Sequence, residues 1–182
     1  MEVGALIFHP YVILAATGQP AEVLVAAAGP DDLAATKGSP QWQTDWTSGY
    51  LADQNLEIAA IKAMDGEIIG LGAYQIRGKS AYVFILYGES APHSNPTMRK
   101  REERKYFGIG ELLLAYGIKY SIDHGCRGDV VFEAKTDELA RHYERDFHAR
   151  PVASLHSGMK RYMLADEEAW QLFSHYLKEA EQ

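Results

Sequence analysis

The sequence predicts an α+β fold, with a mixed, mostly antiparallel twisted sheet and helices on both faces. Three observations lead to this prediction. Two β-prone segments flank a tight-turn signal at Asp65-Gly66, as in a hairpin. An unbroken apolar run over residues 81–87 is typical of a strand covered on both sides. The segment 105–147 then reads as helix, strand and helix, so the strands on either side of its first helix should be parallel.

Composition places the chain among ordinary globular proteins. Its 182 residues are 47% apolar and 24% charged, and this length fits one domain over residues 1–182. The formal net charge of −7 argues against partners such as nucleic acid or an anionic membrane, because both require a basic surface. The same charge favours a cationic or neutral substrate.

The cysteine and histidine content gives no sign of a metal site. The single cysteine, Cys126, excludes an intrachain disulfide and a cysteine-based zinc cluster, and we expect it to be a small buried residue. No His, Asp or Glu grouping has metal-ligand spacing, so no metal is expected. The N-terminal Met1-Glu2-Val3 lacks the basic region of a signal peptide, and no apolar run could span a bilayer. We therefore expect a cytoplasmic location.

The first 55 residues carry few signals. Three short segments are β-prone: residues 5–8, 11–14 and 23–25. Asp31 or Asp32 is suited to cap a short helix. Ser39-Pro40 predicts the start of a second helix, whose aromatic residues would form one stripe: Trp42, Trp46 and Tyr50. Such a stripe packs on a sheet or lines a substrate pocket, and both interpretations stay open.

Three successive strands are predicted in the middle of the chain. Residues 56–63 and 67–76 are the arms of the hairpin, and residues 81–87 form the third strand. A long irregular connection follows over residues 88–106, and its segment 99–105 is dense in charge. That segment is either a solvated loop or a source of cations for a nearby phosphate.

The connection leads to Gly108 and Gly110, at the start of a helix predicted over residues 110–123. Without side chains at these positions, a ligand can approach the N–H groups of the first turn, which have no intrahelical partner. These donors and the positive end of the helix dipole suit a pyrophosphate. The Walker pattern is absent, and Leu113 occupies the third glycine position of the dinucleotide fingerprint.

The C-terminal elements follow from local signals. Residues 129–134 predict a strand, and Thr136 is suited to cap the next helix. Residues 158–164 predict a final strand. Asp166 is then expected to cap a terminal helix whose inward face carries three residues: Trp170, Phe173 and Leu177.

This order of elements, with the motif Lys105-Tyr-Phe-Gly108-Ile-Gly110, resembles the GCN5-related N-acetyltransferase (GNAT) family over about residues 56–165. In that family the loop reads Arg/Gln-x-x-Gly-x-Gly/Ala, and its amides hold the pyrophosphate of acetyl-CoA. Lys105 keeps the charge of the usual residue without its planar fork. The resemblance implies an α/β/α sandwich and cofactor contacts from eight residues: Lys105, Tyr106, Phe107, Gly108, Ile109, Gly110, Glu111 and Thr136.

A second motif lies on the next helix. Tyr143-Glu-Arg matches the core of the family pattern Asn-x-x-Ala-x-x-x-Tyr-Glu-Lys-x-Gly-Phe, whereas Phe147-His148 replaces its Gly-Phe. In the family this tyrosine protonates the departing thiolate, so the resemblance implies that Tyr143 is the general acid. Three further segments resemble a subgroup of bacterial GNAT proteins, which implies no substrate: residues 89–92, 134–136 and 142–144.

Two residues are candidates for the base that removes the amine proton. Glu89 ends the third strand, where family members that use a glutamate place it, and partial burial would suit it to this role. The other interpretation of Glu89 is a surface charge at a strand end. His93 is the second candidate, because histidine titrates near neutral pH, although it lies on the connection.

The resemblance implies acetyl transfer from acetyl-CoA to a small-molecule or peptide amine, by direct attack in a ternary complex and without a metal. A homodimer is an expected assembly, because dimers are common in the family. Two alternatives stay open. One is a non-catalytic acyl-CoA-binding or sensing module of the same fold, and the other is an enzyme that uses a longer acyl chain.

Overall fold

A computed structural model describes residues 5–52, 55–154 and 158–181, so Met1-Glu2-Val3 lies outside the described residues. The chain forms two compact units. The first contains the residues up to Ala73, Tyr87–Leu113 and the residues from Tyr176 on, and the second contains Tyr74–Leu86 and Leu114–His175. Strands β5 (Ile68–Arg77) and β6 (Tyr82–Ser90) and helix α3 (Ile109–Asp123) contribute residues to both units.

The first unit is built on antiparallel strands in the order β7-β2-β3-β4-β5. The strands not yet named are β2 (Tyr11–Leu14), β3 (Pro20–Ala27), β4 (Glu57–Ala63) and β7 (Tyr106–Phe107). The predicted hairpin arms are confirmed as β4 and β5. Gly66 in the turn between them has a φ of 92°, a left-handed conformation that glycine adopts without strain.

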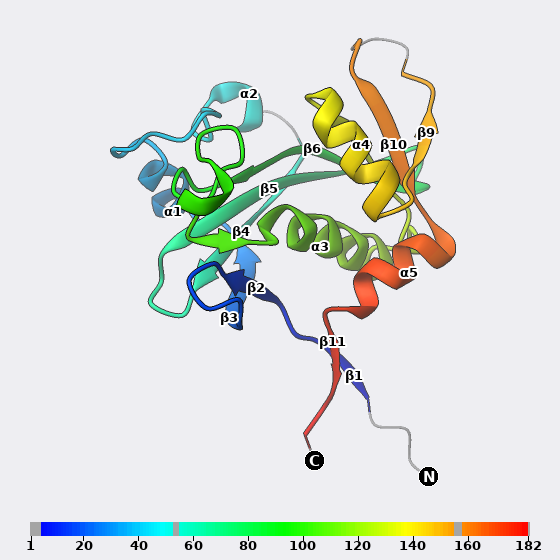
Figure 1. The fold of residues 1–182 in the computed structure, drawn as a ribbon. Coiled ribbons are helices and arrows are strands. Elements are labelled where there is room, and N and C mark those ends of the chain that lie inside the picture. Colours follow the sequence, from blue (N-terminus) through cyan, green and yellow to red (C-terminus); the bar gives the residue numbers. More distant parts are fainter. Residues whose placement is uncertain (1–4, 53–54, 155–157, 182) are drawn as a thin grey trace. The chain divides into compact units, whose positions relative to one another are not determined.

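Two further strands of the first unit form a separate sheet. β1 (Leu6–Phe8) and β11 (Leu177–Glu179) form an antiparallel two-stranded sheet, and they lie side by side in Figure 1. The Ala180 N–H extends this sheet by donating to the Ala5 carbonyl at 2.9 Å. The prediction that Leu177 belongs to a helix was therefore wrong.

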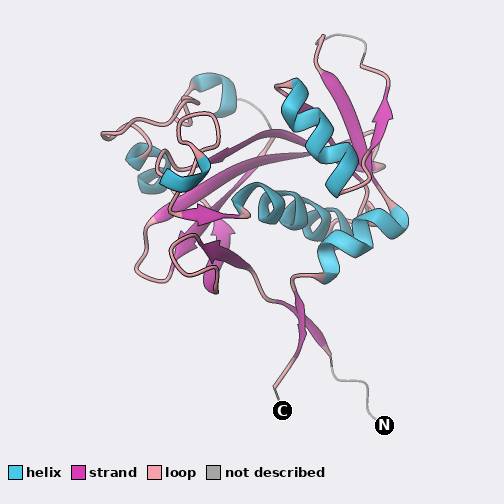
Figure 2. Ribbon diagram, viewed as in Figure 1, coloured by secondary structure: helices cyan, strands magenta, loops and turns pink. Residues whose placement is uncertain are grey.

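The segment between β3 and β4 differs most from expectation. Its helices are short: α1 (Pro30–Ala35) and α2 (Gly49–Ala52). The helix predicted from Ser39 is wrong, because residues 39–47 form an irregular loop, drawn in pink in Figure 2. Trp42 and Trp46 are buried in this loop, whereas Tyr50 is 56% exposed, so the three do not form one stripe. The predicted cap at Asp31 or Asp32 is wrong, because the N-cap of α1 is Gly29. Asp32 lies in the first turn instead, where its carboxylate accepts the Gly29 N–H at 2.8 Å.

The second unit carries the parallel pair. Its strand order is β5-β6-β8-β10-β9, and β8 (Val130–Ala134) runs parallel to β6, as predicted from the intervening helix. The other pairs of this unit, β8 with β10 (Lys160–Leu164) and β10 with β9 (Arg150–Val152), are antiparallel. The predicted strand over residues 158–164 is thus confirmed as β10.

Three helices belong wholly or mostly to the second unit. Gly117 of α3 lies close to β6, because a Cβ there would be 2.9 Å from Cδ1 of Ile85. Helix α4 (Asp137–Asp146) packs against β8. Helix α5 (Asp166–Ser174) begins after an N-cap at Ala165 rather than Asp166, and its Trp170 is 53% exposed instead of facing inward. Cys126 is fully buried, as expected.

Candidate active site

The glycine loop (Lys105–Gly110) ends at the N-terminus of α3, in the first unit. Gly108 has a φ of 85°, and its carbonyl accepts the Leu112 N–H at 3.0 Å, which starts the helix. A Cβ at Gly108 or Gly110 would have no atom within 4 Å, so the space above both residues is open. The first-turn N–H groups of this 15-residue helix therefore adjoin a space that an anion can enter. This geometry fits a pyrophosphate.

Ile109, between the two glycines, fixes the loop from beneath. Its side chain is 3% exposed and lies over Gly70 of β5. A Cβ at Gly70 would be only 2.8 Å from Cγ2 of Ile109, so the close approach depends on glycine at that position. Ile109 is therefore a core residue that anchors the loop through its side chain, which leaves only its backbone for ligand contact.

A short ladder fixes the residues just before the glycines. β7 pairs with β2 through Phe107 with Ile13 and Tyr106 with Leu14, and the Ala15 N–H donates to the Lys105 carbonyl at 3.0 Å. Above the strand, the guanidinium of Arg101 lies 4.3 Å from the centroid of the Phe107 ring. At this distance a cation–π contact forms, so Arg101 packs on the loop.

The ammonium of Lys105 is paired with a carboxylate. Its Nζ lies 2.9 Å from Oε2 of Glu67, and the hydrogen bond to Glu67 raises the pKa of Lys105. The other Glu67 oxygen lies 2.7 Å from Nε2 of His93. Partial desolvation would raise the pKa of Glu67, but the hydrogen bonds from Lys105 and His93 outweigh it and the pKa is lowered. The positive charge expected at Lys105 thus already has an internal partner.

Glu89 is buried within β6 and binds the loop that contains the two tryptophans. Its side chain is 6% exposed. One carboxylate oxygen accepts the Gln43 N–H at 2.6 Å, and the other accepts the Thr44 N–H at 3.0 Å and Nε1–H of Trp46 at 3.1 Å. The Trp46 ring also meets Tyr87 edge-on, with the centroids 6.4 Å apart. A carboxylate with three donors anchors its loop, and these contacts compete with any role as a base.

Tyr143 lies on α4, in the second unit, among aromatic rings. The Phe132 ring meets it edge-on with the centroids 4.9 Å apart, and the Tyr162 ring does so at 6.0 Å. Burial raises the pKa of the Tyr143 phenol above its ordinary value of 10.0. No hydrogen bond joins its hydroxyl to any residue that the structure describes. The group is thus a neutral phenol whose proton is available for donation.

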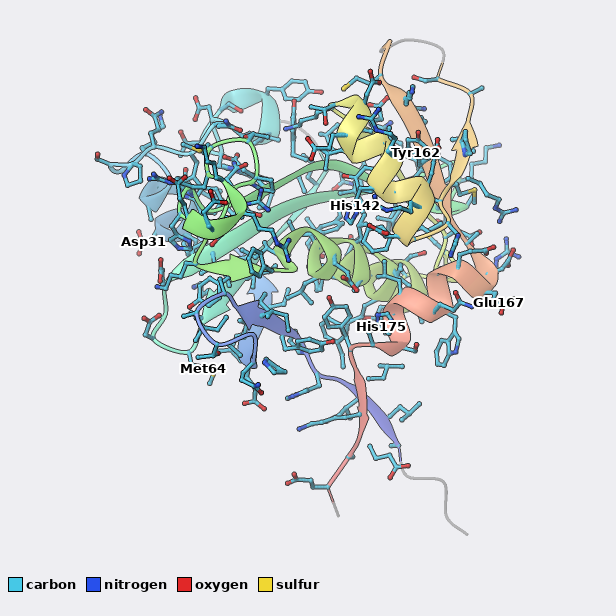
Figure 3. The ribbon with its side chains drawn as sticks, in the orientation of Figure 1. Asp31, Met64, His142, Tyr162, Glu167 and His175 are labelled. Atoms are coloured by element: carbon cyan, nitrogen blue, oxygen red, sulfur yellow. The ribbon has the colours of Figure 1, made fainter. Side chains whose placement is uncertain are left out.

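Unlike Tyr143, other polar side chains on and beside α4 have hydrogen-bond partners. Figure 3 labels His142 on α4 and Tyr162 on β10. The Tyr162 hydroxyl donates to Glu144 at 2.7 Å, and this bond, with burial, raises the pKa of Tyr162 to about 12. Thr136 caps α4 as predicted, because its Oγ1 accepts the Leu139 N–H at 3.1 Å. Thr136 remains a predicted cofactor contact, although its Oγ1 already accepts a hydrogen bond from the first turn of α4.

The predicted site residues divide between the units. The glycine loop, Glu111, Glu89 and His93 belong to the first unit, and Thr136 and Tyr143 belong to the second. Sequence reasoning missed Glu67 and Ser94, which contact His93 on opposite sides of its ring. A glutamate at the end of a turn and a serine in a loop have no pattern that would single them out.

Within residues 5–52, 55–154 and 158–181, no cluster of three His, Cys, Asp or Glu side chains is arranged to hold a metal ion. None of the described helices has both the length and the apolar character needed to cross a membrane.

No model of a known protein family matches the sequence, and no curated protein matches it significantly. Solved structures do match. A Bacillus subtilis acetyltransferase in complex with CoA is 15% identical, with a TM-score of 0.51 over 79% of this chain and 97% of that chain. Spermidine/spermine N-acetyltransferase SpeG from Vibrio cholerae, in complex with manganese ions, is 11% identical, with a TM-score of 0.53 over 82% and 95%.

A third match is the dodecameric spermidine N-acetyltransferase of Vibrio cholerae, 11% identical, with a TM-score of 0.54 over 82% of this chain and 96% of that chain. At these identities the likeness shows the fold. The predicted fold class is therefore confirmed: the chain has the mixed-sheet α+β fold of the GNAT acetyltransferases.

Proposed function

We propose that this protein is an acyl-CoA-dependent N-acetyltransferase of the GNAT family, which moves an acetyl group from acetyl-CoA to an amine. The observation that carries the proposal is the open space above Gly108 and Gly110 at the start of α3. Backbone donors beside open space suit the pyrophosphate of CoA. A structural neighbour with this fold was solved in complex with CoA, which supports the same ligand here.

The proposed reaction is direct attack in a ternary complex. The amine nitrogen bonds to the thioester carbonyl carbon, the carbon–sulfur bond breaks, and the amine loses one proton. The departing thiolate of CoA takes a proton from Tyr143. The raised pKa of this phenol keeps it protonated at neutral pH, and its hydroxyl has no competing bond to the described residues.

The geometry argues against both residues that the sequence suggests as the base for the amine proton. Glu89, which we expected to act as the base, would have to give up hydrogen bonds to three N–H donors. His93 is also engaged at both ring nitrogens. We therefore propose that water takes the amine proton and that Glu89 holds the Gln43–Trp46 loop in place.

The proposed acceptor is a small-molecule or peptide amine. The net charge of −7 favours a cationic one, and two of the structural neighbours are named for spermidine. One neighbour is described as a dodecamer, so we propose that this chain also assembles, with a homodimer as the simplest case. A cytoplasmic location and the absence of nucleic-acid and membrane partners remain predictions from the sequence.

A non-catalytic acyl-CoA-binding module is the second candidate. The engagement of both Glu89 and His93 favours it, because neither expected base is free to act. Thiol release from acetyl-CoA, followed with a panel of amines that includes spermidine, separates the two candidates. Acetyl-CoA binding with no thiol release for any amine would favour the module.

The proposal is tested by calorimetric titration of the purified protein with acetyl-CoA, using substitutions at Gly110. This residue is exposed and lacks a positive φ, so a side chain there meets open space without strain. Gly110→Glu places a carboxylate against the phosphates, and we expect binding to be lost. Gly110→Ala adds bulk without charge and should weaken binding less. Gly49→Glu is the matched control, because Gly49 also lies in the first turn of a helix beside open space.

Micromolar binding by the wild type that survives in Gly49→Glu but not in Gly110→Glu would support the proposed site. Equal binding by Gly110→Glu and the wild type would place acetyl-CoA elsewhere. If the folded wild type does not bind acetyl-CoA, the loop is a structural turn and the proposed function is wrong.

A further inference from the structure

We propose that Glu67, His93 and Ser94 form a positioning relay that holds the backbone N–H of Tyr106, and with it the glycine loop, in the conformation that binds acyl-CoA. The link to acyl-CoA rests on the proposed function, whereas the positioning of the loop does not. Glu67 directly precedes β5, and His93 and Ser94 lie in the connection between β6 and β7.

The relay is defined by three consecutive contacts. The Tyr106 N–H donates to Oγ of Ser94 at 3.0 Å. Oγ of Ser94 lies 2.6 Å from Nδ1 of His93, and Nε2 of His93 lies 2.7 Å from Oε1 of Glu67. The His93 carbonyl also accepts the Lys105 N–H at 3.1 Å. The two residues that open the loop are therefore both bonded to the His93-Ser94 pair.

The donors and acceptors of the relay are consistent with hydrogen bonds that all run in one direction, from Tyr106 toward Ser94 and from Ser94 through His93 to Glu67. The Glu67 carboxylate only accepts, so Nε2 of His93 carries the proton that it donates to Glu67. Nδ1 of a neutral His93 then accepts, and the Ser94 hydroxyl donates to it. The same hydroxyl oxygen accepts from Tyr106. Each group makes the bonds that its chemistry allows, and bonds that run in one direction strengthen one another.

Because it is buried, the hydrogen bond between Ser94 and Tyr106 should contribute most to holding the loop. Ser94 is 3% exposed and Tyr106 is 9% exposed, so water cannot readily replace Oγ of Ser94 as the acceptor of the Tyr106 N–H. Removing that oxygen leaves a buried donor without a partner, which shifts the backbone that leads into Gly108. At the outer end, Glu67 also holds Nζ of Lys105 at 2.9 Å, so one carboxylate restrains the loop through two routes.

The order of Glu67, His93 and Ser94 resembles a nucleophilic triad, but the geometry opposes that role. Ser94 is buried, and its oxygen already accepts from a backbone N–H. An attacking serine needs its oxygen directed at a substrate. Lys105 pairs with Glu67, and the Tyr106 ring lies 5.9 Å from the His93 ring between centroids, so both residues belong to the segment being positioned. Ser94 is thus a positioning residue.

The test compares Ser94→Ala with Ser94→Thr, which keeps the hydroxyl, and with His93→Leu. Two quantities are measured: hydrogen exchange of the Tyr106 amide without ligand, and the Kd for acetyl-CoA. For Ser94→Ala and His93→Leu we expect about tenfold faster exchange and about tenfold weaker binding, from one lost buried hydrogen bond. We expect kcat to change less than about twofold, because no reacting atom is touched.

Ser94→Thr should restore both quantities to within about threefold of the wild type. Asp123→Asn is the control, because it removes the carboxylate from another lysine ion pair, with Lys119. Unchanged Tyr106 exchange in folded Ser94→Ala would overturn the relay. Faster exchange with unchanged Kd would overturn the link to binding. If the wild type fails to bind acetyl-CoA, the proposed function fails, and the exchange rates alone then decide the relay.

Discussion

The glycine loop and the surroundings of Tyr143 are organised in opposite ways. The loop is held by a β ladder, by a carboxylate that binds Lys105 and by the relay that ends on the Tyr106 N–H. Tyr143 is held by aromatic rings, and its hydroxyl has no hydrogen bond to the described residues. The polar groups around the loop are bonded to one another and fix its position, whereas the Tyr143 hydroxyl makes no such bond to the described residues.

This difference follows from what each region is proposed to do. Anion binding by backbone amides requires donors that are fixed before the ligand arrives, because reorganising them would weaken binding. Proton donation requires a neutral hydroxyl with no competing acceptor, and an apolar surround provides it by raising the pKa.

Removing the Tyr143 hydroxyl should be the most damaging change to turnover. For Tyr143→Phe we expect kcat to fall about 10²–10⁴-fold, because the thiolate loses its general acid, while acetyl-CoA binding stays unchanged. Thiol-release kinetics and calorimetry measure the two quantities. Tyr162→Phe is the matched control, since its hydroxyl donates to Glu144 and we expect kcat to stay near the wild-type value. Equal losses in both variants would assign the effect to packing of the aromatic cluster.

Glu89→Gln should lower stability more than any other single change proposed here. An amide offers one acceptor oxygen where the carboxylate offers two, so its NH₂ group faces an N–H donor of the Gln43–Trp46 loop. We expect the free energy of unfolding to fall by about 2–3 kcal/mol, measured by urea denaturation. Glu102→Gln, at an exposed carboxylate, should stay within about 0.5 kcal/mol of the wild type. Unchanged stability in Glu89→Gln would restore Glu89 as a candidate base.

Gly70→Ala tests the anchor beneath the glycine loop. The new methyl would lie 2.8 Å from Cγ2 of Ile109, so Ile109 and the loop above it must move. We expect a loss of about 1–3 kcal/mol in unfolding free energy, together with weaker acetyl-CoA binding. Gly88→Ala is the matched strand control, because its nearest contact would be an ordinary 3.5 Å to Leu113. Tight binding by Gly70→Ala would show that the loop tolerates displacement.

The smallest expected effect concerns pH. The pKa of Glu67 is lowered in the folded state, so its contribution to stability is present above the ordinary value of 4.5 and is lost as the pH falls through the folded pKa. Because the Glu67 and Lys105 side chains are 35% and 46% exposed, we expect this contribution to be under about 1 kcal/mol. Urea denaturation of the wild type and Glu67→Gln should differ at pH 7 and converge toward pH 3. A constant difference would contradict the lowered pKa.

Sequence patterns predicted the elements that have local causes. The hairpin of β4 and β5 has a turn signal, and α3 begins at a glycine pair and ends before Gly125, whose φ is 79°. The pattern failed where a distant residue decides the structure. Ser39-Pro40 and the aromatic spacing indicate a helix, but Glu89 binds the N–H groups of Gln43 and Thr44 in a loop instead.

In the candidate site, too, local sequence predicts only the features that have a local cause. The open space at Gly108 and Gly110 follows from the absence of side chains, so the sequence could predict it. The relay joins Glu67 to residues 26 and 27 positions further along the chain, and no periodicity connects them. Short strands such as β7 and β11 were missed for a related reason, because two or three residues are too few to show alternation.

The pairing of β1 with β11 has a consequence for synthesis on the ribosome. β1 is the first described strand to be made and β11 is the last, so their pairing waits until translation has passed Glu179. Leu6 and Ile7 are 54% and 42% exposed even when paired. Until then a nascent chain carries β1 as an open apolar edge, which the same segment of a neighbouring nascent chain can meet. Once β11 pairs with β1, one edge of β1 is no longer available for pairing with another chain.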